Sequence, residues 1–466
     1  MERANTQIIN LIVQVFLARM IAPEEFGSLA VLSVFFNIAT IFVQKGLSSS
    51  LIRKKQADDL DYDTAFIVSI FIAIVLYIVL FVAAPYIATI FNSSELKNAL
   101  RVLTLNLLFG ALYCIQNAIL VRQMKFKIIF FRGLISSIIS GGIGITMAIH
   151  GFGLWALVAQ IVSNQIILCL IVMNSIEWKP HFRFSFERLS EIVSFGGKIL
   201  ISELLVYIIE GIRTLIVGKK FTTELLSYYD RGQSYPATIM RNIHDTIGSV
   251  LLPIYSKKQD EPELLATAMY QAISICMFLI TPFFVGLAAV AKPLISVLLT
   301  EKWLPCVPFF IVFCFYQITY PIQGITRQVL YARGNSELVL KMEVIKGIIT
   351  MIALVISLKI SVFAIAVSAL ITTYFITGFN LFYTKKVIPI QIKKVFINIK
   401  NTLIYNVGMF LIIFAINFVP LENGIKLLIQ IFLGIITYIT FAIIFKDKNY
   451  KTCLKLLSVI LNKKFN

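Results

Sequence analysis

The feature that most constrains this chain is a succession of apolar runs, each close to the length that crosses a bilayer. A transmembrane helix needs about 20 mostly apolar residues, and such runs recur along all 466 residues with short polar breaks between them. Only 14% of the residues are charged, whereas a soluble domain has roughly a quarter. The sequence therefore predicts an all-α polytopic membrane protein.

The same runs exclude several other classes. No long polar stretch is left in the sequence to form a large soluble catalytic domain. A transmembrane β-barrel is disfavoured because its strands alternate apolar and polar residues with period two. The first run contains Gln14 and Arg19 and is followed by many others, so we do not interpret it as a cleaved signal peptide.

Apolar runs between polar breaks predict about 14 transmembrane helices. They are Arg3–Ile21, Gly27–Ser49, Thr64–Phe91, Leu100–Val121, Ile128–His150, Phe152–Ile176, Ile192–Gly218, Tyr235–Tyr255, Leu265–Ala291, Leu304–Leu330, Glu337–Leu358, Ser361–Tyr383, Leu403–Phe418 and Ile425–Phe445. We expect two pseudo-symmetric six-helix lobes, at 1–176 and 192–383, joined by a cytoplasmic loop at 177–191. A basic cytoplasmic linker (384–402), an extra helix pair (403–446) and a basic cytoplasmic tail (447–466) follow.

Lys and Arg outnumber Asp and Glu by 42 to 24, which gives a net charge of +18. In a soluble protein this balance points to nucleic acid, but in a membrane protein basic residues collect in cytoplasmic loops and fix the topology. Alternate loops of this chain are basic, from Arg53–Lys55 to the C-terminal tail. We therefore expect no nucleic acid partner, and both termini in the cytoplasm.

Two short matches indicate an internal repeat. Arg19, Glu24, Phe26 and Gly27 parallel Lys219, Glu224, Leu226 and Ser227, and Arg122–Gln123 parallels Arg327–Gln328. Repeats with an even number of helices are parallel and are related by an axis along the membrane normal. The matches therefore favour two lobes of the same topology.

Polar residues at helical spacing mark four of the predicted helices. Stripes on one helix face are formed by Arg3, Gln7, Asn10 and Gln14; by Asn37 and Gln44 with neighbouring Ser and Thr; by Glu203, Tyr207, Glu210 and Thr214; and by Arg231, Ser234, Thr238, Arg241 and Asp245. A charge that faces lipid at mid-bilayer costs about 3 kcal/mol. The stripes therefore predict a shared hydrated cavity between the lobes, although a buried Glu210–Arg213 ion pair explains those two residues equally well.

The predicted cavity is cationic. Its substrate-binding residues would be Arg3, Gln7, Asn10, Gln14, Asn37, Gln44, Lys45, Arg213, Arg231 and Arg241, and guanidinium groups suit the oxygens of a phosphate. Glu203, Glu210 and Asp245 are candidates for coupling to H+ or Na+. The six cysteines lack metal-ligand spacing. We therefore expect no metal and no other cofactor; that the chain has no catalytic residues is implied by the family resemblance given next.

Several strings resemble bacterial polysaccharide exporters of the Wzx type, in the branch of colanic-acid and teichuronic-acid exporters. They occur in the family's order: ERANTQIINLIVQVFLARMIAPEEFGSLAV at the start, then GLSSSLIRKK, GFGLWALVAQ, FGGKILISELL, LLSYYDRGQSYP, LLPIYSKKQ and EKWLPCVPF. GFGLWALVAQ and YYDRGQ are the more specific ones. Family members usually have a dozen or more residues before the Glu-Arg pair, which here directly follows Met1.

The resemblance implies the multidrug/oligosaccharidyl-lipid/polysaccharide exporter fold of MATE and MurJ proteins. It also implies a transporter, not an enzyme, that turns undecaprenyl-pyrophosphate-linked oligosaccharide across the bacterial inner membrane for O-antigen, capsule or exopolysaccharide biosynthesis. The partners would be that lipid, the bilayer, and a polysaccharide polymerase and ligase.

Two other functions compete with this interpretation. A cation-coupled multidrug exporter has the same fold, but it favours an acidic, aromatic cavity, and the basic stripes argue against it. A membrane glycosyltransferase or polysaccharide ligase typically carries acidic catalytic motifs and a large outer loop, neither of which the sequence contains.

Overall fold

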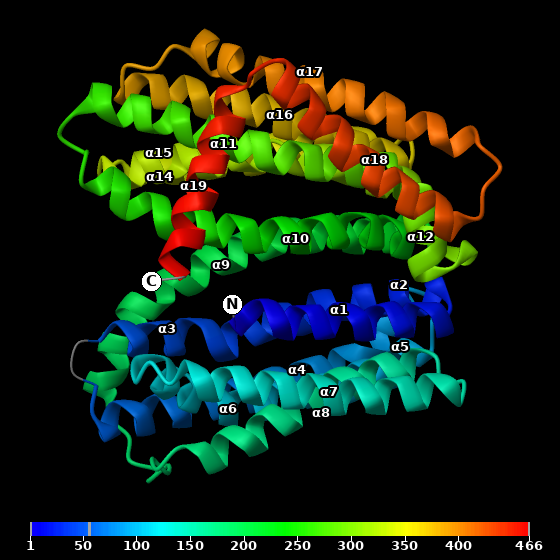
Figure 1. Ribbon diagram of the computed structural model, residues 1–466. Coiled ribbons are helices and arrows are strands. Elements are labelled where there is room, and N and C mark those ends of the chain that lie inside the picture. The colour runs from blue at the N-terminus through cyan, green and yellow to red at the C-terminus, as the bar shows by residue number, and fades with distance from the viewer. Residues whose placement is uncertain (1, 55–56, 465–466) are drawn as a thin grey trace. The chain divides into compact units, whose positions relative to one another are not determined.

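The computed structural model describes residues 2–54 and 57–464, which form helices joined by turns and short connections (Figure 1). Packing divides the chain into two compact units, Met1–Ser227 and Tyr228–Asn466. Each unit is described by itself below.

Unit 1 is a bundle built from hairpins. Its helices are α1 (Glu2–Met20), α2 (Pro23–Thr40), the π-helical segment η1 (Ile41–Lys45), α3 (Gly46–Arg53), α4 (Asp59–Ile90), α5 (Glu95–Leu103), α6 (Asn106–Arg122), α7 (Phe126–Ile149), α8 (Leu154–Ser175) and α9 (Phe186–Lys220). α7 packs against α8 and α1, and α9 packs against α2 and α3.

Unit 2 contains the remaining helices. They are α10 (Thr223–Ser256), which begins in unit 1, α11 (Pro262–Ala289), α12 (Ala291–Leu299), the 3-10 segment η2 (Glu301–Cys306), α13 (Val307–Gln317), α14 (Tyr320–Ala332), α15 (Ser336–Ser357), α16 (Val362–Val387), α17 (Ile392–Ala415), the 3-10 segment η3 (Ile416–Phe418), α18 (Asn423–Ile444) and α19 (Lys448–Lys464). α15 and α14 both pack against α16, and α11 packs against α17.

Helices lie at the predicted spans, but several of these spans are interrupted. Gly27–Ser49 contains the π-helical turn, Leu100–Val121 is split into α5 and α6, and Leu304–Leu330 comprises η2, α13 and α14. At the α5–α6 break, Thr104 turns its hydroxyl back to the carbonyl of Arg101. Local hydrogen bonds of this kind compete with the helical ladder.

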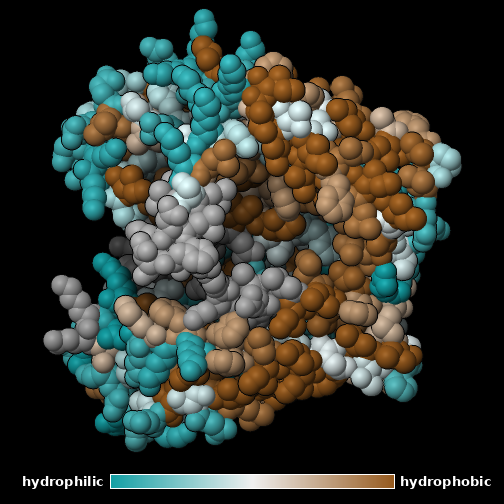
Figure 2. Space-filling model, in the orientation of Figure 1, coloured by the Kyte–Doolittle hydropathy of each residue, from teal (hydrophilic) through white to brown (hydrophobic). Residues whose placement is uncertain are grey.

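Within the described ranges, ten helices are long and apolar enough to cross a membrane. Apolar side chains also cover their outer faces: on α18, for example, Leu428, Phe432 and Ile436 are exposed. Figure 2 shows such side chains gathered over the region of α17 and α18, with hydrophilic ones at helix ends. These surfaces suit lipid, and the all-helical membrane class is confirmed. The count of 14 stays a prediction.

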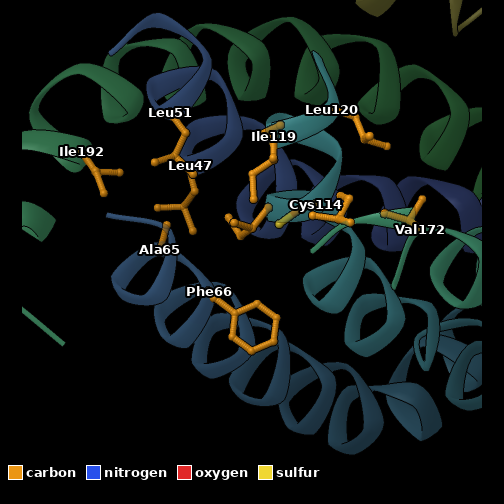
Figure 3. Close-up of a cluster of buried hydrophobic side chains, with 12 residues drawn as sticks. Leu47, Leu51, Ala65, Phe66, Cys114, Ile119, Leu120, Val172 and Ile192 are labelled. Atoms are coloured by element: carbon orange, nitrogen blue, oxygen red, sulfur yellow. The ribbon is translucent and has the colours of Figure 1, made fainter. Parts of the chain in front are cut away.

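A buried apolar cluster ties α9 to unit 1 (Figure 3). It joins Leu47 and Leu51 of α3, Phe66 of α4, Cys114 of α6 and Ile192 of α9. The division by packing therefore falls one helix later than the predicted loop between the lobes at 177–191. The predicted domain ranges, in which α9 opens the second lobe, stay a prediction.

Candidate functional site

The polar stripe on α1 lies on a partly buried face. Gln7, Asn10 and Gln14 are all half-buried. The side-chain amide of Gln14 donates to Oε1 of Gln160 on α8 over 3.4 Å, whereas Oε1 of Gln7 is buried without a hydrogen-bond partner in the described part of the chain. The side chain of Arg3 lies outside what the structure describes. One member of the stripe thus has a partner inside unit 1.

Two further stripe residues also have neighbours inside unit 1. Asn37 on α2 donates from Nδ2 to the hydroxyl of Tyr207 on α9 over 2.6 Å. The amide of Gln44 lies against Gly110 of α6, where it leaves no room for a Cβ atom. Lys45, by contrast, is exposed. Asn37 and Gln44 therefore serve helix packing in this structure, and a role in substrate binding stays a prediction.

The predicted residues of α9 and α10 lie at different depths. Glu203 and Glu210 are exposed and Arg213 is half-buried. On α10, the guanidinium of Arg231 lies 5.8 Å from the ring centroid of Tyr235, and Arg241 is exposed. The side chain of Asp245 lies outside the described part of the molecule. The three predicted coupling carboxylates therefore remain predictions.

The structure also reveals a group of ion pairs in unit 1, which we call the α3–α4–α9 cluster: Lys54, Asp58, Asp61, Arg188 and Glu191. Nζ of Lys54 lies 2.7 Å from Asp61 and 2.8 Å from Glu191, and Arg188 lies 3.0 Å from Asp58. Asp58 and Asp61 also cap α4 through reciprocal backbone bonds. The cluster fastens the start of α4 to α3 and α9.

The electrostatics of this cluster follow from these contacts. The backbone N–H of Asp61, followed by the charge of Arg188, holds the pKa of Asp58 below its usual value. The hydrogen bond from Lys54 lowers the pKa of Glu191. Burial by itself lowers the pKa of Lys54, but hydrogen bonds to Asp61 and Glu191 outweigh burial and raise it. All three groups are therefore charged at neutral pH.

In unit 2, a tight turn joins α14 to α15. The backbone N–H of Asn335 bonds to the carbonyl of Leu330, and Gly334 adopts a positive φ of 74°, a conformation that glycine adopts without strain. The turn brings Arg327 of α14 beside α15. There, Nη2 of Arg327 lies 3.0 Å from Oε1 of Glu343, and Nζ of Lys346 lies 3.4 Å from Oε2 of the same carboxylate.

These three charges border a pocket between α14, α15 and α16, which we call the α14–α16 pocket. It is lined by Arg327, Leu330, Val339, Met342, Glu343, Lys346, Ile376 and Asn380. A polar seam lies beside it, where the amide of Gln323 donates to the hydroxyls of Thr373 and Thr377, both over 2.9 Å. The pocket thus combines apolar walls with two cations and one carboxylate.

Sequence reasoning did not select the residues of this pocket. Arg327 was assigned only to a repeat match, and Glu343 and Lys346 lie inside the predicted span Glu337–Leu358. The available signal was charge density, because the first half of α15 carries Lys341 as well as Glu343 and Lys346. A charge inside a transmembrane span is a functional hypothesis by default.

The helical architecture and two likenesses to solved structures define the class: a multi-pass helical membrane protein of the multidrug/oligosaccharidyl-lipid/polysaccharide exporter fold. The chain is similar to the lipid II flippase MurJ in an inward closed conformation, with a TM-score of 0.78 at 19% identity, over 96% of this chain and 98% of that one. It is also similar to an inward-facing multidrug resistance MATE family transporter, with a TM-score of 0.63 at 15% identity, over 82% and 95%. At such identities the likeness shows the fold alone.

Residues 16–308 match the family described as polysaccharide biosynthesis protein, and the chain belongs to that family. It is 24% identical to the succinoglycan biosynthesis transport protein ExoT of Rhizobium meliloti (strain 1021), over 62% of this chain and 58% of ExoT. It is 24% identical to the teichuronic acid biosynthesis protein TuaB of Bacillus subtilis (strain 168), over 64% and 62%. It is 22% identical to the lipopolysaccharide biosynthesis protein WzxC of Escherichia coli (strain K12), over 75% and 71%.

The chain thus spans less than two thirds of the length of the first two of these relatives. The family predicted from the sequence motifs is confirmed.

Proposed function

We propose that the protein is a flippase that carries undecaprenyl-pyrophosphate-linked oligosaccharide across the bacterial inner membrane by alternating access. The lipid tail would stay in the bilayer while the charged headgroup crosses the membrane. Both termini would lie in the cytoplasm, and a polymerase and a ligase would act on the delivered oligosaccharide. The product would serve O-antigen, capsule or exopolysaccharide biosynthesis.

The observation that carries this proposal is the presence of basic side chains inside predicted transmembrane helices of a polysaccharide biosynthesis protein. Arg213, Arg327 and Lys346 are half-buried within such helices, and half-buried Arg231 lies shortly before the predicted span Tyr235–Tyr255. A charged headgroup does not enter hydrocarbon unless its charge is balanced, and arginine matches phosphate oxygens with a forked geometry. A pyrophosphate headgroup fits these cations better than a cationic drug does.

Coupling to an ion belongs to the proposal as well. Glu203, Glu210 and Asp245 are the carboxylates that would take up H+ or Na+ during the transport cycle. Glu203 and Glu210 are exposed side chains within the predicted span Ile192–Gly218.

The first test is ligand-induced stabilisation of the purified protein in detergent. A ligand that binds only the folded state raises the thermal midpoint by mass action. Undecaprenyl pyrophosphate should raise it, and a cationic dye should not. Stabilisation by the dye alone would contradict the proposal and favour the multidrug exporter.

Substitutions on α10 test its stripe. Arg231→Ala and Arg241→Ala should each abolish transport of the pyrophosphate lipid in proteoliposomes and leave membrane insertion intact. Lys257→Ala is the matched control, because Lys257 is an exposed basic residue at the turn that follows α10. Wild-type transport in both α10 variants would remove this helix from the binding site.

A further inference from the structure

The α14–α16 pocket holds more positive than negative charge. Arg327, Glu343 and Lys346 bring two cations to one carboxylate, and their side chains are 27%, 38% and 31% exposed. A surplus cation within a transmembrane span is costly unless it has a counter-ion or faces a wet cavity. The structure therefore contains one positive charge that Glu343 does not neutralise.

The two cations are arranged around Glu343 in a specific way. Oε1 of Glu343 lies 3.0 Å from Nη2 of Arg327, and Oε2 lies 3.4 Å from Nζ of Lys346. A phosphate group also presents two oxygens on one central atom, so it can engage the same guanidinium and ammonium groups. The pyrophosphate of an undecaprenyl-linked oligosaccharide carries two negative charges, one on each phosphate, and would therefore balance both cations, which the single charge of Glu343 does not.

The surroundings separate this arrangement from an ordinary surface ion pair. The pocket floor is apolar, because Leu330, Val339 and Met342 are buried there, and Asn380 on α16 adds a nearly buried amide group to the lining. Exposed apolar side chains such as Val344 and Ile348 lie elsewhere on α15. The charged residues thus line a pocket within unit 2 and lie apart from the apolar surface of α15.

We propose that Arg327 and Lys346 form a binding subsite for a phosphate group of a lipid headgroup, and that Glu343 occupies this subsite in the absence of the lipid. The incoming phosphate displaces the Glu343 carboxylate and takes over its two cationic partners. Glu343 returns when the headgroup leaves, which keeps the affinity low enough for release. The choice of a pyrophosphate lipid as the ligand rests on the proposed function.

The test is a titration of the full-length protein in phosphatidylcholine nanodiscs with undecaprenyl pyrophosphate. Binding is measured by the shift in the thermal midpoint. Arg327→Gln and Lys346→Gln should each weaken binding about tenfold, as expected for the loss of one charge-assisted hydrogen bond. Glu343→Gln should instead tighten binding about threefold or more, because the competing charge is gone. A purely structural ion pair cannot produce this opposite sign.

Two matched controls come from the same helix. Glu337 and Lys341 are exposed on α15, and the affinity of Glu337→Gln and Lys341→Gln should equal that of the wild type. Thermal midpoints without ligand report whether each variant is folded. If Arg327→Gln does not fold, the opposite effects of Glu343→Gln and Lys346→Gln decide the question.

Further titrations distinguish the sources of the phosphate. Phosphatidylglycerol and inorganic pyrophosphate are titrated in the same way. If phosphatidylglycerol is the only probe whose binding changes in the variants as predicted, the subsite binds a bilayer phospholipid. That result contradicts the proposed substrate. Wild-type binding that no variant changes, or weaker binding in Glu343→Gln, overturns the subsite but leaves the proposed function in place. A wild type that binds none of the three probes overturns both.

Discussion

The main groups of ion pairs in the two units carry excess charges of opposite sign. In unit 1, the α3–α4–α9 cluster sets three carboxylates against two cations, and buried Asp61 is bonded to Lys54 and to the backbone of Asp58. In unit 2, two cations share Glu343 beside a pocket. In the unit 1 cluster every carboxylate contacts a cation and the one excess charge is negative, which is typical of a structural contact between helix ends. The excess charge at the pocket of unit 2 is positive, which indicates a site for an anion.

A pair of matching hairpins sharpens this difference. Gln123 and Arg333 cap α6 and α14 with the same backbone bonds, and Asn117 and Arg327 each lie six residues before these caps. In unit 1, Asn117 accepts a hydrogen bond from Arg132, which is only 4% exposed and lies 5.1 Å from the ring of Tyr113. The arginine of the unit 1 hairpin is thus buried, whereas the ion pair of the unit 2 hairpin is partly exposed.

The largest expected effect is in the unit 1 cluster. Asp61→Ala removes a buried carboxylate from Lys54 and from the cap of α4, so it should lower the free energy of unfolding by about 3 kcal/mol. The shift in thermal midpoint in detergent measures this loss. Asp59→Ala, at an exposed neighbouring position, is the control and should change stability by less than about 0.5 kcal/mol.

The next effect compares the hairpins directly. Asn117→Leu leaves the buried guanidinium of Arg132 without this hydrogen bond, and we expect a loss of about 2 kcal/mol. Arg327→Gln at the matching position breaks a partly exposed ion pair and should cost less than about 1 kcal/mol. Equal losses in the two variants would contradict the distinction between a buried hydrogen bond in unit 1 and a partly exposed ion pair in unit 2.

Substitutions in the two turns should have smaller effects on stability, and the two effects should have opposite signs. Met124 in the α6–α7 turn and Gly334 in the α14–α15 turn both have positive φ, at 51° and 74°. Gly334→Ala should destabilise unit 2 by about 1 kcal/mol, although no atom lies near enough to clash. Met124→Gly should relieve a similar strain, and its net gain should be smaller because glycine has more freedom in the unfolded chain.

The smallest effect is the pH dependence of the unit 1 cluster. Asp58 and Glu191 have lowered pKa values, so their stabilisation is present above the ordinary 3.8 and 4.5 and is lost as pH falls through the lowered values. Lys54 has a raised pKa, so its contribution is complete below 10.5 and is lost at higher pH. The difference in thermal midpoint between the wild type and Lys54→Met should be constant from about pH 5 to 10. A change within that window would contradict these assignments.

Most of the fold follows from the sequence, because apolar runs of bilayer length predict helices whatever their neighbours. One repeat match also agrees with the helix ends: α1 and α9 end at Met20 and Lys220, and α2 and α10 begin at Pro23 and Thr223. The match of Arg122 with Arg327 was wrong in register. Arg122 is the last residue of α6 and donates to the carbonyls of Leu51 and Lys54, whereas Arg327 lies five residues before the end of α14.

The site was harder to predict than the fold. Helical spacing identifies which residues share a face. It does not reveal that Asn37 donates a hydrogen bond to Tyr207, or that Gln44 packs against Gly110, on other helices. The contact of Arg327 with Glu343 depends on the turn at Gly334, which fixes the register of two helices. Such contacts require the packed structure.

Transport by three proteins in proteoliposomes tests the central claim most directly: the wild type, Lys346→Gln and the control Lys341→Gln. The rate at which an undecaprenyl-pyrophosphate-linked oligosaccharide crosses the bilayer is measured for each. We predict equal rates for the wild type and Lys341→Gln, and a rate about tenfold lower for Lys346→Gln. Equal rates for all three proteins would contradict a role for the cationic pocket of unit 2 in moving the lipid.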